Sequence, residues 1–187
     1  MKGRMDRQPD EDLLRSARNG SRPAWAELYE RHQGRIYRFA RQMGGSPSVA
    51  DEVVQETFLD LLRGGLRFDP GKGSLAAFLL GVARRKSLRL GGPTRESGAD
   101  PLDGVAAHAD LARDVETSQR NEALHRAILA LPEHYRETVV LCELSELSYE
   151  EAAEVIGCPV GTVRSRLHRA RLMLLERLVE KGIHGVH

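Results

Sequence analysis

A capping pattern and a glycine turn near the end of the chain constrain its fold more than any other feature. Ser148 and Glu151 form an S-x-x-E pattern, in which each side chain accepts a hydrogen bond from the other residue's backbone amide at a helix start. Gly157 suits the left-handed conformation that ends a helix, and Pro159 suits the first turn of the next helix. The pattern therefore predicts a short helix, a tight turn and a second helix from about Val160.

The predicted second helix has one apolar face and one basic face. Its apolar residues recur at spacings of three and four, as on a single buried stripe, and these are Val163, Leu167, Ala170, Leu174 and Leu178. No acidic residue occurs between Val160 and Arg171, and the outer face and flank carry Arg164, Ser165, Arg166, His168, Arg169 and Arg171. A helix-turn-helix places such a helix in the DNA major groove, where arginine pairs with guanine and the polar residues also hold phosphates. The alternative is a solvated basic face on an ordinary amphipathic helix.

The charge balance excludes a uniformly basic nucleic-acid coat. With 28 Lys and Arg residues against 27 Asp and Glu residues, the net charge is +1, so a DNA-binding surface has to be local. Hydrophobic residues make up 41% of the chain and aromatic residues only 5%, a soluble composition that favours helix over sheet. Glutamates are concentrated in residues 131–154, directly before the basic helix, where they support helices and solubility.

The cysteine count and the N-terminal segment bear on compartment and cofactors. Cys142 and Cys158 are too few for a disulfide framework or a zinc site. The segment MKGRMDRQPDED has no apolar core, and no segment approaches the length that a membrane span needs. The sequence therefore predicts a cytoplasmic protein with no metal, no cofactor and no membrane insertion.

Caps and apolar periodicity predict helices along most of the chain, and no strand pattern of useful length is present. The predicted fold is all-α, with two small helical domains at residues 10–92 and 118–180 joined by a flexible, acidic linker at 93–117. The linker is predicted from its prolines, its acidic residues and its lack of periodicity. In the helix that follows Ser46-Pro47, Leu61 and Leu62 are both expected to face inward.

Three stretches together carry a family resemblance. The first runs from AWAELYERHQ to DEVVQETFLDLL, the second is GSLAAFLLGVARRKSLRL, and the third is LPEHYRETVVLCELSELSYEEAAEVIGCPVGTVRSRLHRARLMLLERL. In this order they resemble the second and fourth conserved domains of bacterial RNA polymerase sigma factors of the extracytoplasmic-function type. The resemblance implies a promoter-specificity subunit that binds core polymerase, recognises the minus-35 element and melts the minus-10 element.

The resemblance also implies which residues contact polymerase. In this family the helix that matches residues 51–62 docks on the clamp coiled coil of the largest subunit. Glu52, Gln55 and Glu56 would accept hydrogen bonds from basic residues there, and Leu59 would add an apolar contact. Without the resemblance, these four residues are an ordinary solvated helix face.

A second implied surface engages the non-template strand of the minus-10 element. Holding unstacked bases requires a pocket or aromatic face, and the backbone requires cations. The residues of these types in the matching loop and helix are Arg67, Phe68, Lys72, Arg84, Arg85, Lys86 and Arg89. The chain departs from the usual family pattern at Leu75 and Phe78, where Phe and Trp are common, and core packing is the favoured interpretation of Phe78.

Within the stretch that resembles the fourth domain, residues 161–170 resemble the minus-35 recognition helix. This resemblance adds Thr162 to the basic and polar residues of the helix that are predicted to contact minus-35 DNA. The resemblance implies two partners, core RNA polymerase and promoter DNA. The polymerase would be bound through its largest-subunit clamp and flap regions. It also allows an anti-sigma factor, which many members have. The linker would run toward the polymerase active-site cleft or act as a plain spacer.

Two other classes of protein fit part of the sequence. A dimeric helix-turn-helix regulator explains residues 148–178 but gives no role to VVQETF or to the cations at 84–89. An enzyme is disfavoured because Glu122 and His125 form only one E-x-x-H pair, whereas a di-iron site needs two. The Gly71-Lys72-Gly73 run also lacks the strand and helix of a phosphate-binding loop. We therefore expect a protein without catalytic residues.

Overall fold

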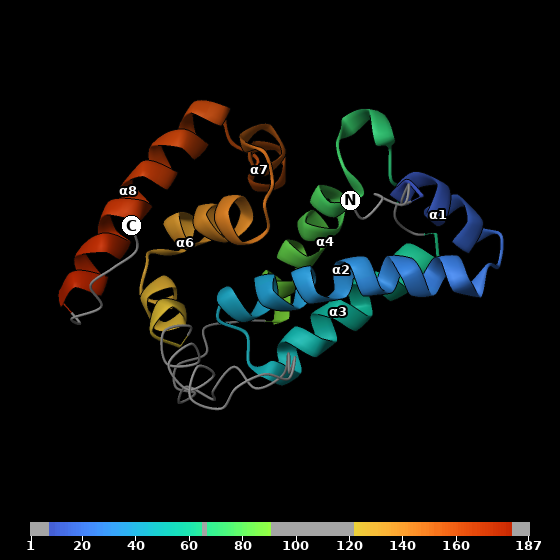
Figure 1. Cartoon of the computed structure of the whole chain (residues 1–187), viewed down its shortest axis with the longest axis horizontal. Coiled ribbons are helices and arrows are strands. Elements are labelled where there is room, and N and C mark those ends of the chain that lie inside the picture. Colours follow the sequence, from blue (N-terminus) through green and yellow to red (C-terminus); the bar gives the residue numbers. More distant parts are fainter. Residues whose placement is uncertain (1–7, 65–66, 91–121, 181–187) are drawn as a thin grey trace, which may run out of the picture.

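A computed structural model describes residues 8–64, 67–90 and 122–180, and within these ranges every regular element is a helix (Figure 1). The first block contains α1 (Asp10–Arg18), α2 (Arg22–Gln42), α3 (Pro47–Leu62), a 3-10 turn (Pro70–Lys72) and α4 (Leu75–Leu90). The second block contains a helix at 122–129, α6 (Glu133–Val139), a π-helical turn (Val140–Leu144), α7 (Tyr149–Ile156) and α8 (Val160–Glu180). The predicted all-α fold is confirmed. The predicted linker at 93–117 lies outside the described residues.

Two helices of the first block, α2 and α3, begin where serine and proline occur together. The Ser21 side chain accepts a hydrogen bond from the Ala24 amide at 3.4 Å, and Ser46 does the same for the Val49 amide at 3.3 Å. A proline follows in the first turn of each helix, where its missing N–H has no partner to lose. The side chains that α1 to α4 bury most completely are Leu28, Ile36, Phe39, Val53, Leu61, Leu79 and Leu80. Leu62, expected to face inward, is 46% exposed, because it lies one residue beyond the inward register that Leu61 occupies.

The helix-turn-helix forms as the sequence predicts. Ser148 and Glu151 make both hydrogen bonds of the capping box at the start of α7. Gly157 ends α7 with φ +79°, in the left-handed region, and α8 begins directly after Pro159. The π-helical turn after α6 has no counterpart in the sequence prediction, since nothing in the local pattern distinguishes it from a continued α-helix.

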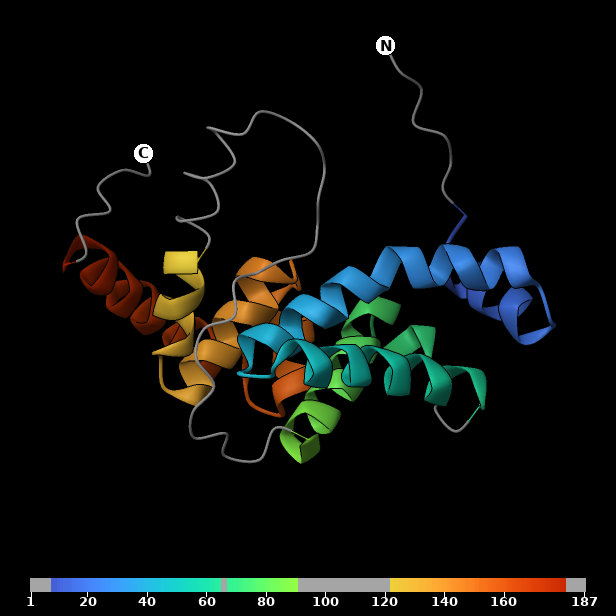
Figure 2. The same ribbon diagram turned by 90° about the horizontal axis from the view of Figure 1, so that it is seen from below.

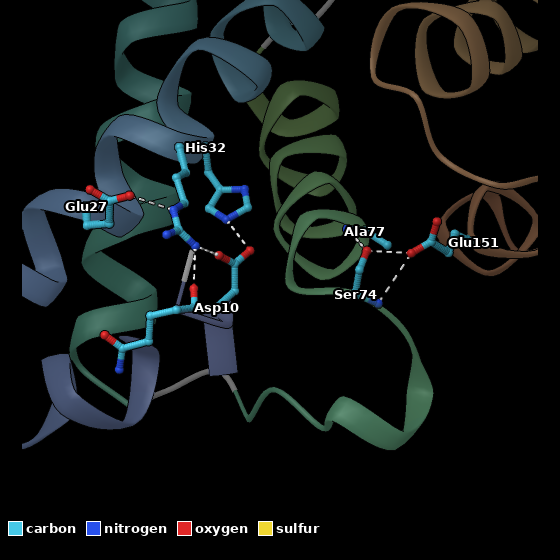
Figure 3. Close-up of polar contacts among 8 residues, drawn as sticks. Asp10, Glu27, His32, Ser74, Ala77 and Glu151 are labelled. Atoms are coloured by element: carbon cyan, nitrogen blue, oxygen red, sulfur yellow. Dashed lines mark hydrogen bonds and ion pairs between the residues drawn. The ribbon is translucent and has the colours of Figure 1, made fainter. Parts of the chain in front are cut away.

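A polar cluster fastens α1 to α2 (Figure 3). Arg31 Nη1 and His32 Nε2 each donate to the Asp10 carboxylate at 2.8 Å, and Arg31 Nε donates to Glu27 at 2.8 Å. The hydrogen bond from His32 and then the one from Arg31 hold the pKa of Asp10 below its usual value, although partial burial opposes them. The ionised carboxylate therefore stabilises the fold.

The two blocks pack against each other through α4, which lies between α2 and α3 on one side and α7 on the other (Figures 1 and 2). One apolar core is continuous across both blocks, since Val140, Leu141, Ala152 and Val163 belong to the same buried cluster as the residues of α1 to α4. Gly81 of α4 lies next to α7, and a Cβ at this position would make an ordinary contact with Val155 Cγ2 at 4.0 Å. The two predicted domains therefore form one packed body in this structure.

Substitution of Gly157 tests the turn of the helix-turn-helix. Gly157→Ala is expected to lower the free energy of unfolding by about 1–2 kcal/mol, because alanine is disfavoured at positive φ. Gly161→Ala is the matched control, since Gly161 is helical and a Cβ there would meet nothing within 4 Å. The control should be neutral or stabilising in urea denaturation. Equal effects of the two substitutions would contradict the left-handed assignment.

Substitution of Asp10 tests the cluster between α1 and α2. Asp10→Asn is expected to lower the free energy of unfolding at neutral pH by about 2 kcal/mol, because two charge-assisted hydrogen bonds are lost. The folded-state pKa of Asp10 lies below the unfolded value of 3.8. The wild-type advantage is therefore complete above that value and is lost as the pH falls through the folded pKa. Asp12→Asn, at an exposed pair with Arg15, should change little in the same pH series.

Candidate nucleic-acid and polymerase interfaces

The predicted recognition helix, α8, has the expected division into a buried and an exposed side. Val163, Leu167 and Ala170 are at most 1% exposed. The residues on the opposite side that are exposed are Arg164, Ser165, His168, Arg169 and Arg171, whereas Thr162 and Arg166 are half-buried at its edge. The structure thus brings all seven predicted minus-35 residues to one surface.

A shallow groove of about 260 Å³ lies between α8 and the start of α6. Thr162, Ser165, Arg166 and Arg169 form its α8 wall, and the other wall is the adjacent pair His134 and Tyr135. A hydrogen bond with Tyr135 raises the pKa of Arg169, so Tyr135 orients this guanidinium. The sequence does not mark the α6 pair as part of a site, because no charge run or motif includes it. The combination of cations and hydroxyls along one groove suits a DNA backbone.

Arg171 is held differently from the other basic residues of α8. Its guanidinium forms an ion pair with Glu143 of the π-helical turn. The hydrogen bond of that pair raises the pKa of Arg171. Arg171 therefore lies at the border of the basic surface and is partly neutralised.

The loop before α4 forms a compact aromatic and basic surface. The Asp69 side chain accepts from the Gly71 amide at 3.0 Å, and Ser74 caps α4 by accepting from Ala77 at 3.2 Å. The rings of Phe68 and Phe78 lie 5.5 Å apart. Both line a cavity of about 250 Å³ whose cationic residues are Arg67, Lys72 and Arg85. Phe78 is half-buried, so it packs in part and also contributes to the cavity wall.

Three predicted minus-10 cations lie away from this cavity. Arg84 forms an ion pair with Glu137 of α6, and Arg89 forms one with Glu56 of α3. Lys86 is only 8% exposed, and its Nζ lies 3.0 Å from Glu56 and 2.6 Å from Asp60. In this structure Lys86, predicted to contact DNA, is therefore held by two carboxylates of α3 and is not open to a ligand. Lys86 is seven residues after Leu79, so both lie on the buried face of α4. This spacing can be read from the sequence alone.

The residues predicted to contact polymerase lie on α3. Glu52, Gln55 and Leu59 are exposed along one side of the helix, Leu59 by 43%. Glu56 lies on the same side but is bonded to Lys86 and Arg89. Leu62, the residue wrongly expected to be inward, extends the apolar part of this face. The exposed surface is thus one of acceptors next to a pair of leucines.

Other reactive groups are accounted for by packing. His125 Nδ1 lies 2.9 Å from Gln42 Oε1, and burial and then nearby Arg41 lower its pKa. Burial and the neighbouring Glu143 raise the pKa of the Cys142 thiol to about 11. No group of three or more His, Cys, Asp and Glu residues suited to a metal ion occurs in the described part of the chain. None of the described helices is both long and apolar enough to cross a membrane.

Comparisons with known proteins agree with this geometry. Residues 28–90 match the family model of sigma-70 region 2, and residues 121–174 match that of sigma-70 region 4. The chain is 32% identical to the ECF RNA polymerase sigma factor SigM of Mycobacterium tuberculosis, over 94% of this chain and 87% of that protein. It is 34% identical to the ECF sigma factor SigE of Mycolicibacterium smegmatis over 84% of this chain, which spans 63% of that longer relative.

Solved structures extend the agreement to the arrangement of the helices. CnrH, solved in complex with the cytosolic domain of CnrY, matches with a TM-score of 0.70 and 27% identity, over 91% of this chain and 97% of that chain. The sigma factor RpoE of Bartonella quintana, solved with the anti-sigma factor NepR, matches with a TM-score of 0.58 and 26% identity, over 78% and 91% of the two chains.

The chain therefore belongs to the ECF sigma factors of RNA polymerase. It is a promoter-specificity subunit of RNA polymerase, with a block that matches region 2 and a block that matches region 4. The alternative of a dimeric helix-turn-helix regulator is wrong, because the region 2 match covers α2, α3 and α4.

Substitution of Lys86 and its neighbour separates packing from DNA contact. Lys86→Ala is expected to lower the free energy of unfolding by about 1–2 kcal/mol, because two partly exposed carboxylates lose their shared cation. Arg85→Ala removes an exposed cation one residue away and should change stability by no more than about 0.5 kcal/mol. Urea denaturation of both variants checks the contrast. A larger loss for the Arg85 variant would refute the assignment of Lys86 to the core.

Proposed function

We propose that the exposed acceptors and leucines of α3 dock on the clamp of the polymerase largest subunit. Glu52, Gln55 and Leu59 support this proposal, because they form one exposed side of the helix. Glu56 acts with them while its ion pairs with Lys86 and Arg89 join the docking helix to α4. The region 4 block reaches the flap, which would hold it at the upstream promoter element.

The minus-10 strand is captured at the cavity between the loop and α4. Phe68 and Phe78 offer aromatic faces for unstacked bases, and Arg67, Lys72 and Arg85 offer cations for the phosphates. Arg84 and Arg89 lie at the margin and become available only when their present carboxylate partners move away. Lys86 is excluded from this set because it is buried.

The minus-35 duplex binds at the exposed side of α8. Arg164, Ser165, His168 and Arg169 face the groove edges or phosphates, and Thr162, Arg166 and Arg171 flank them. Tyr135 and His134 add a wall that orients Arg169. The observation that carries the proposal is the presence of the basic face and the aromatic cavity in one chain. The basic face lies within the residues that match region 4, and the cavity lies mainly within those that match region 2.

The protein has no catalytic role of its own in this proposal, since bond formation belongs to the polymerase. It works in the cytoplasm, where its polymerase is found. Relatives solved with partners, such as RpoE with the anti-sigma factor NepR, make an anti-sigma factor a further partner to seek.

Two variants test the division of labour in run-off transcription with purified core polymerase. Arg169→Ala is expected to lower minus-35-dependent initiation about tenfold and to leave core binding unchanged, because a base contact contributes about 1–3 kcal/mol. Arg177→Ala, later on the same helix, is the control. Gln55→Ala with Leu59→Ala should weaken core binding in a pull-down and leave duplex minus-35 binding unchanged. If both variants lost both activities equally, the residue assignments would be wrong.

A further inference from the structure

Two arginines near the middle of α8 are held by acceptors that lie outside that helix. Arg169 makes a hydrogen bond with the Tyr135 side chain of α6. Arg171 donates to the Glu143 carboxylate of the π-helical turn and also makes a hydrogen bond with the Tyr149 side chain at the start of α7. A hydroxyl is neutral, so Arg169 is oriented and keeps its full charge for DNA. A carboxylate is not neutral, so Arg171 is both oriented and neutralised.

The π-helical turn is the element that places Glu143 against α8. The Ser145 amide donates to the Val140 carbonyl at 2.9 Å, a bond between residues five apart that adds one residue to the turn. Val140 and Leu141 are 0% exposed and anchor the turn in the core, whereas Glu143 is exposed. The carboxylate therefore projects from an anchored backbone at the border of the basic surface of α8.

Arg171 lies on the same stripe of α8 as Arg164. The two residues are seven apart, which leaves them within about 20° of each other around the helix and about 10 Å apart along it. In a helix-turn-helix the N-terminal residues of the recognition helix contact the base edges. Arg171 follows two turns later, where a DNA contact would be made to a phosphate. Such a contact adds affinity but carries no sequence information.

Folding stability does not account for the pair of Arg171 and Glu143. The Arg171 side chain is 58% exposed and the Glu143 side chain is 42% exposed. Exposed ion pairs contribute little to stability, because water and salt screen them. The pair lies beside the surface that is proposed to bind DNA, so its main effect is on the binding of DNA there.

We propose that Glu143 is a specificity-determining residue that acts through Arg171. Its carboxylate withdraws Arg171 from phosphates and so weakens binding to duplexes that lack the minus-35 element. On the minus-35 duplex the base contacts of Arg164 and Arg169 fix the position of α8, and binding depends less on Arg171. On other duplexes the affinity depends on how many phosphates the cations reach. The inference rests on the proposed minus-35 function of α8.

The first test measures duplex binding by the full-length chain with fluorescence anisotropy. One labelled duplex carries the minus-35 element of a promoter that the wild-type holoenzyme transcribes, and the other carries the same bases in shuffled order. Glu143→Gln is expected to raise the affinity for the shuffled duplex about fivefold, as one added phosphate contact would, and that for the minus-35 duplex less than about twofold.

The control for this test is Glu150→Gln, which removes the same charge from an exposed position of α7. It should leave the ratio of the two affinities at the wild-type value, because Arg171 keeps its partner. Equal effects of Glu143→Gln and Glu150→Gln would overturn the proposal. An equal gain of Glu143→Gln on both duplexes would overturn it as well.

Salt dependence shows whether Arg171 is the cation that is released. Each phosphate neutralised by a cation steepens the fall of log affinity with log salt by about 0.9 on duplex DNA. Glu143→Gln should steepen the slope on the shuffled duplex by about this amount, and the same substitution in an Arg171→Ala background should leave the slope unchanged. A folding defect adds no phosphate contact, so the slope separates positioning from a structural effect. Equal steepening without Arg171 would refute its role.

The behaviour of wild type distinguishes this inference from the proposed function. If wild type binds the two duplexes equally, the proposed minus-35 function of α8 fails, and the inference fails with it. If wild type prefers the minus-35 duplex and Glu143→Gln keeps that preference unchanged, only the inference about Glu143 fails.

Discussion

The burial of α4 on several sides is the constraint on which the rest of the structure depends. Leu75, Leu79 and Leu80 contact the other helices of the first block, and Gly81 faces Val155 of α7. A helix that is apolar on most of its circumference has to be covered on most sides. α3 and α2 cover one part, and the second block covers another.

This burial determines what the polar residues of α4 can do. Lys86 faces α3, and its charge is compensated by Glu56 and Asp60. Arg84 faces α6, and its charge is compensated by Glu137. A buried charge without a partner is strongly destabilising. Removal of either member of these ion pairs would therefore destabilise the fold. The same ion pairs join α4 to α3 and to α6 of the second block.

Local signals predicted much of the fold. The Ser148 and Glu151 box, the left-handed Gly157 and the apolar stripe of α8 each depend on residues close in sequence, and each was predicted correctly. The π-helical turn, the pair of Arg84 with Glu137 and the wall formed by Tyr135 depend on contacts between distant residues, which a single sequence does not encode locally. Lys86 lies between these two cases. Its spacing from Leu79 indicated the buried face of α4, but the basic residues around it in the sequence favoured a prediction of DNA contact.

The near-neutral net charge of +1 is consistent with this pairing of cations and carboxylates. Arg84 of α4 is paired with Glu137, and Glu151 and Glu154 line the same cavity as Arg67, Lys72 and Arg85. Strongly basic surfaces bind DNA of any sequence through counterion release. Carboxylates beside these cations weaken that non-specific attraction. The acidic stretch next to the recognition helix therefore does more than keep the protein soluble.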